Sequence, residues 1–188
     1  MKISFACIIL LFLIACHSAS NKKEISQIVE WIGKELFIPT DIPAFYSMTD
    51  SLDHENPDML YKVLLYCGSE SEENTKLELI KWHSLIKEVE NSLSGKIQFE
   101  FYICSEKKEK FSSFFVDDKF NYPVYFDKED NIGRLNHFPR NNQDYCFLLD
   151  RSNKVLAIGN PIYDQSIRNQ YNQIFTGKIR TAMETTVC

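Results

Sequence analysis

The fold is decided by residues 61–85, which read YKVLLYCGSESEENTKLELIKWHSL. The apolar run at residues 63–66 predicts a central strand that is covered on both faces. Gly68 ends this run, and the spacing of Ser69 and Glu72 fits a capping box, which predicts that a helix begins here. The apolar residues that follow recur at spacings of three and four, so the helix has one face for the sheet. They are Leu79, Trp82, Leu85, Ile86, Val89 and Leu93.

Three glutamates, Glu70, Glu72 and Glu73, follow the predicted central strand. In α/β proteins this is a common place for chemistry, because N–H dipoles converge where a strand leads into a helix. Negative charges also stabilise the first turn of a helix. The sequence therefore predicts a capping role for the three glutamates, with a catalytic carboxylate set as the alternative.

Composition and charge limit the class of protein. The chain has 188 residues, 44% of them hydrophobic and 25% charged, which is typical of one globular domain. Its formal net charge is -5, and its lysines are scattered among acidic residues. We therefore expect no nucleic-acid partner.

The N-terminus has the pattern of an export signal. Lys2 precedes an apolar run at residues 8–14 that is too short for a stable membrane span. Residues 13–16 read LIAC and resemble a bacterial lipobox, which implies cleavage before Cys16 and lipidation of its thiol. A plain secretory signal or an uncleaved anchor is the alternative. Acyl chains on Cys16 would hold the protein on a membrane of the cell envelope, with its domain outside the cytoplasm.

These patterns divide the chain into five parts. We expect a lipoprotein signal peptide at residues 1–15, a lipidated tether at 16–21 and a C-terminal tail at 178–188. Residues 22–57 should form an N-terminal amphipathic helix, over 22–36, and a connecting loop with one short strand. The helix is expected to pack on the domain, although a membrane-surface helix would share its pattern. Residues 58–177 form the main domain.

The rest of the main domain alternates strands and helices. Residues 97–103 alternate apolar and polar side chains and predict a strand, joined to the central strand by a right-handed parallel crossover. Residues 145–158 predict an antiparallel hairpin. The other expected elements are a helix at 106–118, an extended segment at 122–127, a short helix at 131–138 and a last helix at 164–176.

The cysteines provide no metal pattern. Six are encoded, and loss of Cys7 with the signal peptide and lipidation of Cys16 would leave four. An even number in an exported protein permits disulfides, whose connectivity the sequence leaves open. Their spacings of 37, 42 and 42 residues match no zinc motif, so we expect no metal and no other cofactor. The four are Cys67, Cys104, Cys146 and Cys188.

Several segments in this order resemble the thioredoxin-like bacterial lipoproteins. The similarity extends over residues 25–177 and implies an α/β, thioredoxin-like fold, in which a central mixed β-sheet is flanked by helices and an N-terminal amphipathic helix is added. The segments that carry it are KVLLY at 62–66, LELIKWHSLI at 77–86, YPVYFD at 122–127 and FLLDRSNKVLAIGNP at 147–161.

The chain departs from this family at the active site. Redox-active members carry Cys-x-x-Cys at the start of the helix after the central strand, and here these positions are Glu72 and Thr75. The family's cis-proline position falls near Asp144. The resemblance therefore implies a lipid-anchored binding or accessory module of the cell envelope that lacks dithiol chemistry, with another envelope protein as a candidate partner.

The alternative function is a thiol–disulfide oxidoreductase that uses Cys67 with Cys146 or Cys104. In a thioredoxin-type sheet, the strands that carry these thiols are neighbours at one edge, so Cys67 could reach either of the other two. A bridge from Cys67 to Cys146 is the favoured pairing, because Cys146 lies at a strand entry where a loop can adjust. Small, buried and inert thiols are the other interpretation.

Overall fold

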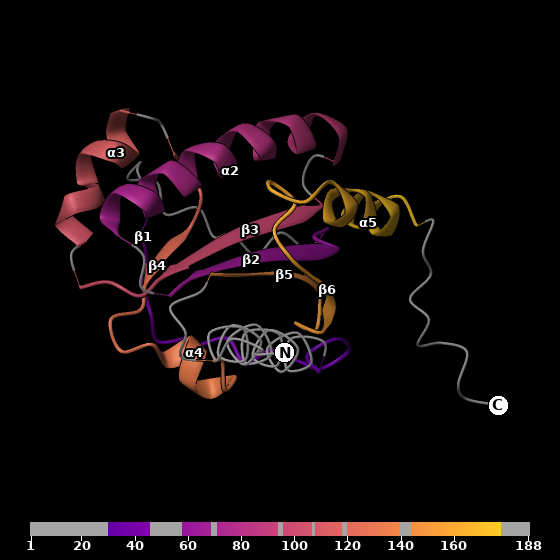
Figure 1. The fold of residues 1–188 in the computed structure, drawn as a ribbon, viewed down its shortest axis with the longest axis horizontal. Coiled ribbons are helices and arrows are strands. Elements are labelled where there is room, and N and C mark those ends of the chain that lie inside the picture. Colours follow the sequence, from indigo (N-terminus) through magenta and orange to yellow (C-terminus); the bar gives the residue numbers. More distant parts are fainter. Residues whose placement is uncertain are drawn as a thin grey trace, which may run out of the picture.

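The computed structural model describes residues 30–45, 58–68, 71–93, 96–106, 108–117, 120–139 and 144–177. They form a six-stranded sheet with helices on both faces (Figure 1). The expected signal peptide, tether and C-terminal tail lie outside these ranges. The strands are β1 (Ala44–Phe45), β2 (Tyr61–Cys67), β3 (Ile97–Ile103), β4 (Val124–Phe126), β5 (Tyr145–Asp150) and β6 (Val155–Ile158).

The sheet is mixed, with the strand order β1-β4-β3-β2-β5-β6. Strands β2, β3 and β4 are parallel, while β5 pairs antiparallel with both β2 and β6. The predicted parallel crossover from β2 to β3 and the predicted β5–β6 hairpin are therefore confirmed. The short β1 pairs antiparallel with β4 at one edge of the sheet.

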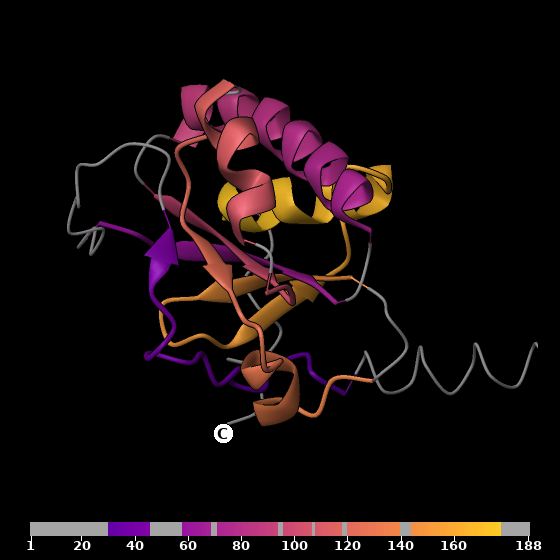
Figure 2. The ribbon, with the colours of Figure 1, turned by 90° about the vertical axis from the view of Figure 1, so that its left-hand side faces the viewer.

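The helices divide between the two faces of the sheet. Helices α2, α3 and α5 lie on one face, and α4 lies on the other, as Figures 1 and 2 show from two directions. No helix among the described residues combines the length and the apolar character that crossing a membrane requires. The helices are α2 (Glu72–Leu93), the 3-10 turn η1 (Lys108–Phe111), α3 (Ser112–Asp117), α4 (Asn131–Leu135) and α5 (Gln165–Phe175).

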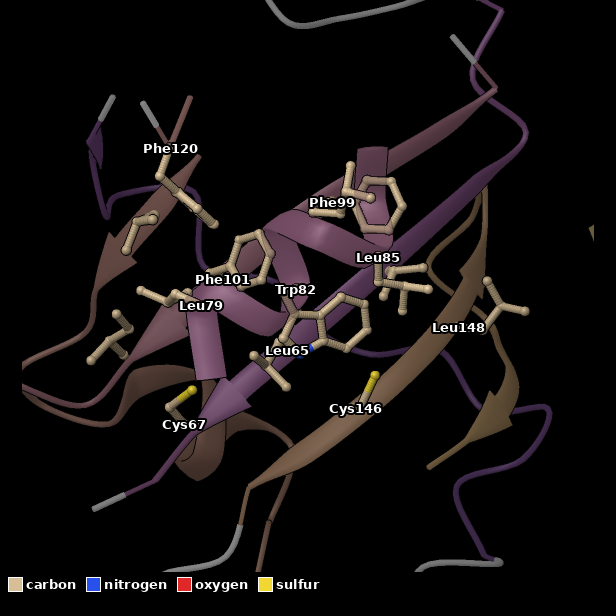
Figure 3. Close-up of a cluster of buried hydrophobic side chains, with 14 of the residues drawn as sticks. Leu65, Cys67, Leu79, Trp82, Leu85, Phe99, Phe101, Phe120, Cys146 and Leu148 are labelled. Atoms are coloured by element: carbon tan, nitrogen blue, oxygen red, sulfur yellow. The ribbon is translucent and has the colours of Figure 1, made fainter. Parts of the chain in front are cut away.

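Two apolar clusters sandwich β2, because its side chains alternate between the faces. Val63, Leu65 and Cys67 face α2, where Trp82 is buried against them (Figure 3). Leu64 and Tyr66 belong to the cluster on the opposite face. The run at residues 63–66 is apolar throughout because both of its faces are covered. The first cluster also contains an aromatic group from β3 and the η1–α3 region, namely Phe99, Phe101, Phe111, Phe114, Phe115 and Phe120.

The second cluster is covered by α4 and by an extended N-terminal segment rather than by the predicted N-terminal helix. The described end of that predicted helix forms a turn at residues 30–33, after which Glu35 makes an antiparallel bridge with Lys154 next to β6. The prediction of a helix over residues 22–36 is therefore wrong for its described part. Leu36, one of the residues that suggested the helix, is buried against the sheet instead, together with Trp31.

Candidate functional site

A pocket of about 500 Å³ opens at the carboxyl ends of β2 and β3, beside the first turn of α2. Cys67 and Gly68 contribute from the end of β2, and Cys104 from the residues after β3. This edge is where α/β sheets usually bind their ligands. Polar and charged side chains line most of the remaining wall, including Ser71, Glu72, Glu73, Ser105, Glu106 and Lys110.

Ser71 caps the helix at this pocket. Its Oγ accepts the N–H of Asn74 at 3.3 Å, and its carbonyl oxygen accepts the N–H of Thr75 at 3.0 Å and the Thr75 hydroxyl at 3.2 Å. The predicted capping box of Ser69 and Glu72 is wrong, because Glu72 is the first residue of α2 rather than its third. Ser69 lies outside the described residues.

Glu72, the first of the two Cys-x-x-Cys positions, joins α2 to η1. Its Oε2 lies 2.6 Å from Nζ of Lys110, and its Oε1 lies 2.8 Å from Nζ of Lys76. The hydrogen bonds from Lys110 and Lys76 hold the pKa of Glu72 below its usual value, and Glu72 raises the pKa of Lys110 in return. Thr75, the second position, is buried with 4% of its surface exposed. Neither position carries a thiol, although both residues line the pocket.

Of the other two glutamates in the predicted set, the structure describes only Glu73. Glu73 lies in the first turn of α2 with Glu72, as a helix-stabilising role requires, and its side chain is exposed. Glu70 lies outside the described residues. Of the proposed carboxylate set, the structure thus places two members at the pocket, and one of these is already engaged by lysines.

Cys67 and Cys146 lie on the α2 side of the sheet, but they are not opposite each other. Leu65 is the register partner of Cys146, and Cys67 lies two residues further along β2. Such diagonal neighbours are about 7–8 Å apart, whereas a disulfide needs Cα atoms roughly 4.4–6.8 Å apart. In Figure 3, Leu65 lies between the two thiols. The expected Cys67–Cys146 bridge is not formed, and all three described cysteines carry thiols.

Cys104 lies on the other side of the sheet. Cys67 pairs with Ile103 in the parallel β2–β3 ladder, so Cys104, one residue later, projects to the opposite face. Its side chain packs against the second apolar cluster, whereas Cys67 belongs to the first. The prediction that Cys67 could reach Cys104 is therefore wrong, because the sheet itself separates the two thiols.

Cys104 forms a partly buried polar group with Tyr66 and Asp130. The Tyr66 hydroxyl donates to Oδ1 of Asp130 at 2.9 Å, and the Cys104 thiol donates to the same oxygen at 3.6 Å. Asp130 has a left-handed backbone with φ of 52°, and a Cβ added to Gly133 would lie 2.1 Å from Oδ1. Gly133 therefore leaves the room that this carboxylate occupies. No sequence pattern marks this group, since Asp130 reads only as a turn residue before a short helix.

Two of the thiols are poor nucleophiles. Burial raises the pKa of Cys104 to about 12, and the carboxylates of Asp130 and Asp127 add to this effect, while the Tyr66 hydrogen bond opposes it. Burial also raises the pKa of Cys146 to about 12, and its Sγ lies 3.5 Å from the hydroxyl of Tyr171. A thiol reacts as its thiolate, so both side chains are inert near neutral pH.

Asp144, at the family's cis-proline position, ties β5 to β2. Its Oδ1 accepts the N–H of Gly68 at 3.1 Å. Every peptide bond in the described part of the chain is trans. Asp144 therefore fixes one rim of the pocket through its side chain.

Metal ligation has no candidate in the described ranges, where no three His, Cys, Asp or Glu side chains come together closely enough to hold an ion. Cys16 and Cys188 lie outside those ranges, so lipidation and the pairing of Cys188 stay predictions.

No family model matches the sequence, and no curated protein matches it. Among solved structures, one from Chlorobium tepidum described as a thiol:disulfide interchange protein DsbE aligns with a TM-score of 0.50 and 16% identity, over 75% of this chain and 99% of that chain. A thioredoxin-like protein from Parabacteroides distasonis aligns with a TM-score of 0.47 and 15% identity, over 76% and 97% of the two chains. The strand order and the likeness to the Chlorobium tepidum protein identify the fold of this chain as thioredoxin-like.

Proposed function

We propose that this protein is a lipid-anchored module of the cell envelope that binds a partner at the pocket and performs no dithiol chemistry. The arrangement at the start of α2 carries the proposal. There, the Glu72 carboxylate is held between Lys76 and Lys110, and Thr75 is buried, at the two positions where redox-active members of the resembled family carry cysteines.

The cysteines elsewhere do not replace that pair. Cys104 and Cys67 belong to opposite faces of the sheet, and Cys146 is offset from Cys67 by two residues. The high pKa values of Cys104 and Cys146 further weaken the alternative oxidoreductase. These observations support a binding role over a catalytic one.

The pocket is suited to a polar partner. It is open, and its wall presents hydroxyls, carboxylates and the Lys110 ammonium group beside the apolar side chains of Ile103 and Phe111. Polar groups that converge on a pocket fix the orientation of a ligand and give specificity. Another protein of the envelope, presenting polar side chains to the pocket, is the partner that we propose.

The test is the reduction of insulin disulfides by dithiothreitol in the presence of the purified protein. We expect the rate with the wild-type chain to equal the rate without protein, because no two of the three cysteines that the structure describes are placed to exchange. A rate close to that of an ordinary thioredoxin would overturn the proposal.

A double variant, Glu72→Cys with Thr75→Cys, serves as the positive control. It places two thiols one helical turn apart at the N-terminus of α2, where the helix dipole and the nearby Lys110 favour a thiolate. We expect this variant to gain insulin reduction above the wild-type background. The matched pair Glu88→Cys with Asn91→Cys, further along the same helix, lacks that environment and should remain at background.

A further inference from the structure

A second concave surface lies on the face of the sheet that carries α4. It is a groove of about 410 Å³ between the N-terminal segment and the end of α4, which we call the lower groove. Trp31, Leu36, Phe37, Leu135 and Pro139 supply its apolar lining. Two of these residues are largely uncovered, since Phe37 is 62% exposed and Leu135 is 51% exposed.

The exposed residues are held in place by the fold. The side chain of Asn136 accepts the N–H of Phe37 at 2.8 Å and donates to the carbonyl oxygen of Phe37 at 2.9 Å. Asn136 is itself buried and also donates to the carbonyl of Ile132 in α4. The backbone at Phe37 is therefore fixed next to α4, and Phe37 and Leu135 line the same groove, where exposed apolar side chains mark a contact surface.

The position of the lower groove points to what covers it. Glu30 and Trp31, the first residues that the structure describes, line the groove. The predicted lipidated residue, Cys16, precedes Glu30 by 14 residues, and a chain of this length spans about 50 Å at most. The groove thus belongs to the part of the domain where the tether to the membrane attaches.

We propose that the lower groove lies against the lipid bilayer, with Phe37 and Leu135 in its interfacial layer. This inference rests on the proposed lipid anchor, which would keep a bilayer within reach of the groove at all times. A tether converts docking into an intramolecular step with a high effective concentration. A small apolar surface therefore suffices for contact.

The charges around the groove favour apolar contact over electrostatic attraction. Lys34 lines it together with Glu30 and Glu35, and Arg134 adjoins Leu135 in α4. Positive and negative side chains are thus balanced at this face. We expect docking on a zwitterionic bilayer as well as on an anionic one, and only a weak effect of salt.

Docking through this groove would set the orientation of the whole domain. Helices α2 and α5 lie on the opposite face of the sheet (Figures 1 and 2). These helices would face away from the membrane. The polar pocket, at the carboxyl edge of the sheet, would stay accessible.

The test compares two engineered thiols with an environment-sensitive fluorophore attached. Leu135→Cys marks the lower groove, and Leu77→Cys on α2 is the matched control, since Leu77 is 55% exposed. Both are made in the full chain with Cys188→Ser, and the acylated protein is reconstituted into phosphatidylcholine vesicles. We expect a blue-shifted emission and severalfold protection from a water-soluble quencher at position 135 but not at position 77. The additional substitution Phe37→Ser should reduce that protection.

Equal quenching at positions 135 and 77 would overturn the inference. The mass of the N-terminal peptide tests the anchor separately, so an acylated chain with equal quenching refutes the docking and leaves the proposed function intact. If no acyl chain is found, the proposed lipid anchor is refuted. The docking is then tested with a chain in which a histidine tag replaces residues 1–15 and binds nickel-chelating lipid in the vesicles, and the quenching at positions 135 and 77 is compared again. Protection that appears only at high protein density would indicate contact between two copies and would also refute the inference.

Discussion

At the scale of single residues, Asp130 influences the thiol of Cys104, one of the two cysteines that line the pocket. Its Oδ1 accepts hydrogen bonds from both Tyr66 and Cys104, and its charge helps to raise the pKa of Cys104 to about 12. At pH 8, a thiol with this pKa is ionised in about one molecule in ten thousand. The low reactivity of Cys104 thus comes first from the burial of its thiol and then from the charge of Asp130 beside it.

Two substitutions should change the alkylation of Cys104 in opposite directions. Asp130→Asn removes a charge that disfavours the thiolate, so the rate of reaction with iodoacetamide should rise, by about tenfold for each unit that the pKa falls. Tyr66→Phe removes a hydrogen bond that favours the thiolate, so the rate should fall. The measurement is peptide mass mapping over a series of pH values.

The same reaction in urea is the control, since unfolding should make the three chains react equally. Asparagine also tolerates the left-handed backbone at position 130, so Asp130→Asn should retain the fold. If Asp130→Asn slowed the alkylation of Cys104, the assignment of this carboxylate would be wrong.

The sequence contained part of this residue-scale information. It placed Cys67 and Cys104 at one edge of the sheet, and both line the pocket. The side of the sheet on which each thiol lies depends on strand register, and a shift of one residue reverses the face. No local pattern sets the register of a parallel pair whose strands are buried on both faces. The separation of the two thiols was therefore visible only in the structure.

At the scale of elements, Glu78 holds α2 to the loop that precedes α5. Its Oε1 accepts the Nε1–H of Trp82 at 3.2 Å and the side-chain N–H of Asn160 at 2.7 Å, and its Oε2 accepts the hydroxyl of Tyr163. The side chain is buried. One carboxylate thus satisfies three neutral donors from two elements, a task that requires two acceptor oxygens.

Glu78→Gln should destabilise the protein by roughly 1–3 kcal/mol, because the amide supplies one acceptor and leaves a buried donor unsatisfied. Urea unfolding measures this free energy. Glu88→Gln is the matched control in the same helix, since Glu88 pairs with Arg168 at the surface and should cost less than about 1 kcal/mol. Equal costs for the two variants would show that the buried hydrogen bonds of Glu78 do not stabilise the fold.

A comparison of individual elements shows where sequence patterns were sufficient to predict the secondary structure. Helix α2 and the β5–β6 hairpin were predicted because each contains many residues of one period. The N-terminal segment was not predicted correctly, because Ile32 and Leu36 fit one helical face in the sequence, whereas in the structure Ile32 is exposed and Leu36 is buried against the sheet. The bridge from Glu35 to Lys154 pairs residues that are far apart in the sequence, and such pairings determine the conformation of short segments like this one.

At the scale of the whole molecule, the order of elements was enough to predict the fold, since each strand pairs with a neighbour that the topology rules allow. The polar pocket could be located in the same way, at the end of β2. The chemistry of the pocket could not be predicted, because Lys110, which pairs with Glu72 of α2, belongs to η1. The lower groove likewise depends on the N-terminal segment and α4, which are far apart in the sequence.

The anchor, the lower groove and the pocket together predict where an envelope partner makes contact. With the lower groove on the bilayer, the pocket faces along the membrane surface, so a photo-crosslinking amino acid at position 73, at the rim of the pocket, should give a discrete adduct in growing cells. The same amino acid at Gln173, exposed on α5, is the control and should give none.

Adding Cys16→Ala should reduce the adduct at position 73, because the unlipidated chain is no longer concentrated at the membrane with its partner. Cell fractionation of the same strain should find this variant released from the membrane or unprocessed, and labelled fatty acid should not enter it. Two results would contradict this picture. Fatty acid in Cys16→Ala would refute the lipidation site, whereas an equal adduct from position 173 would refute the pocket as the site of binding.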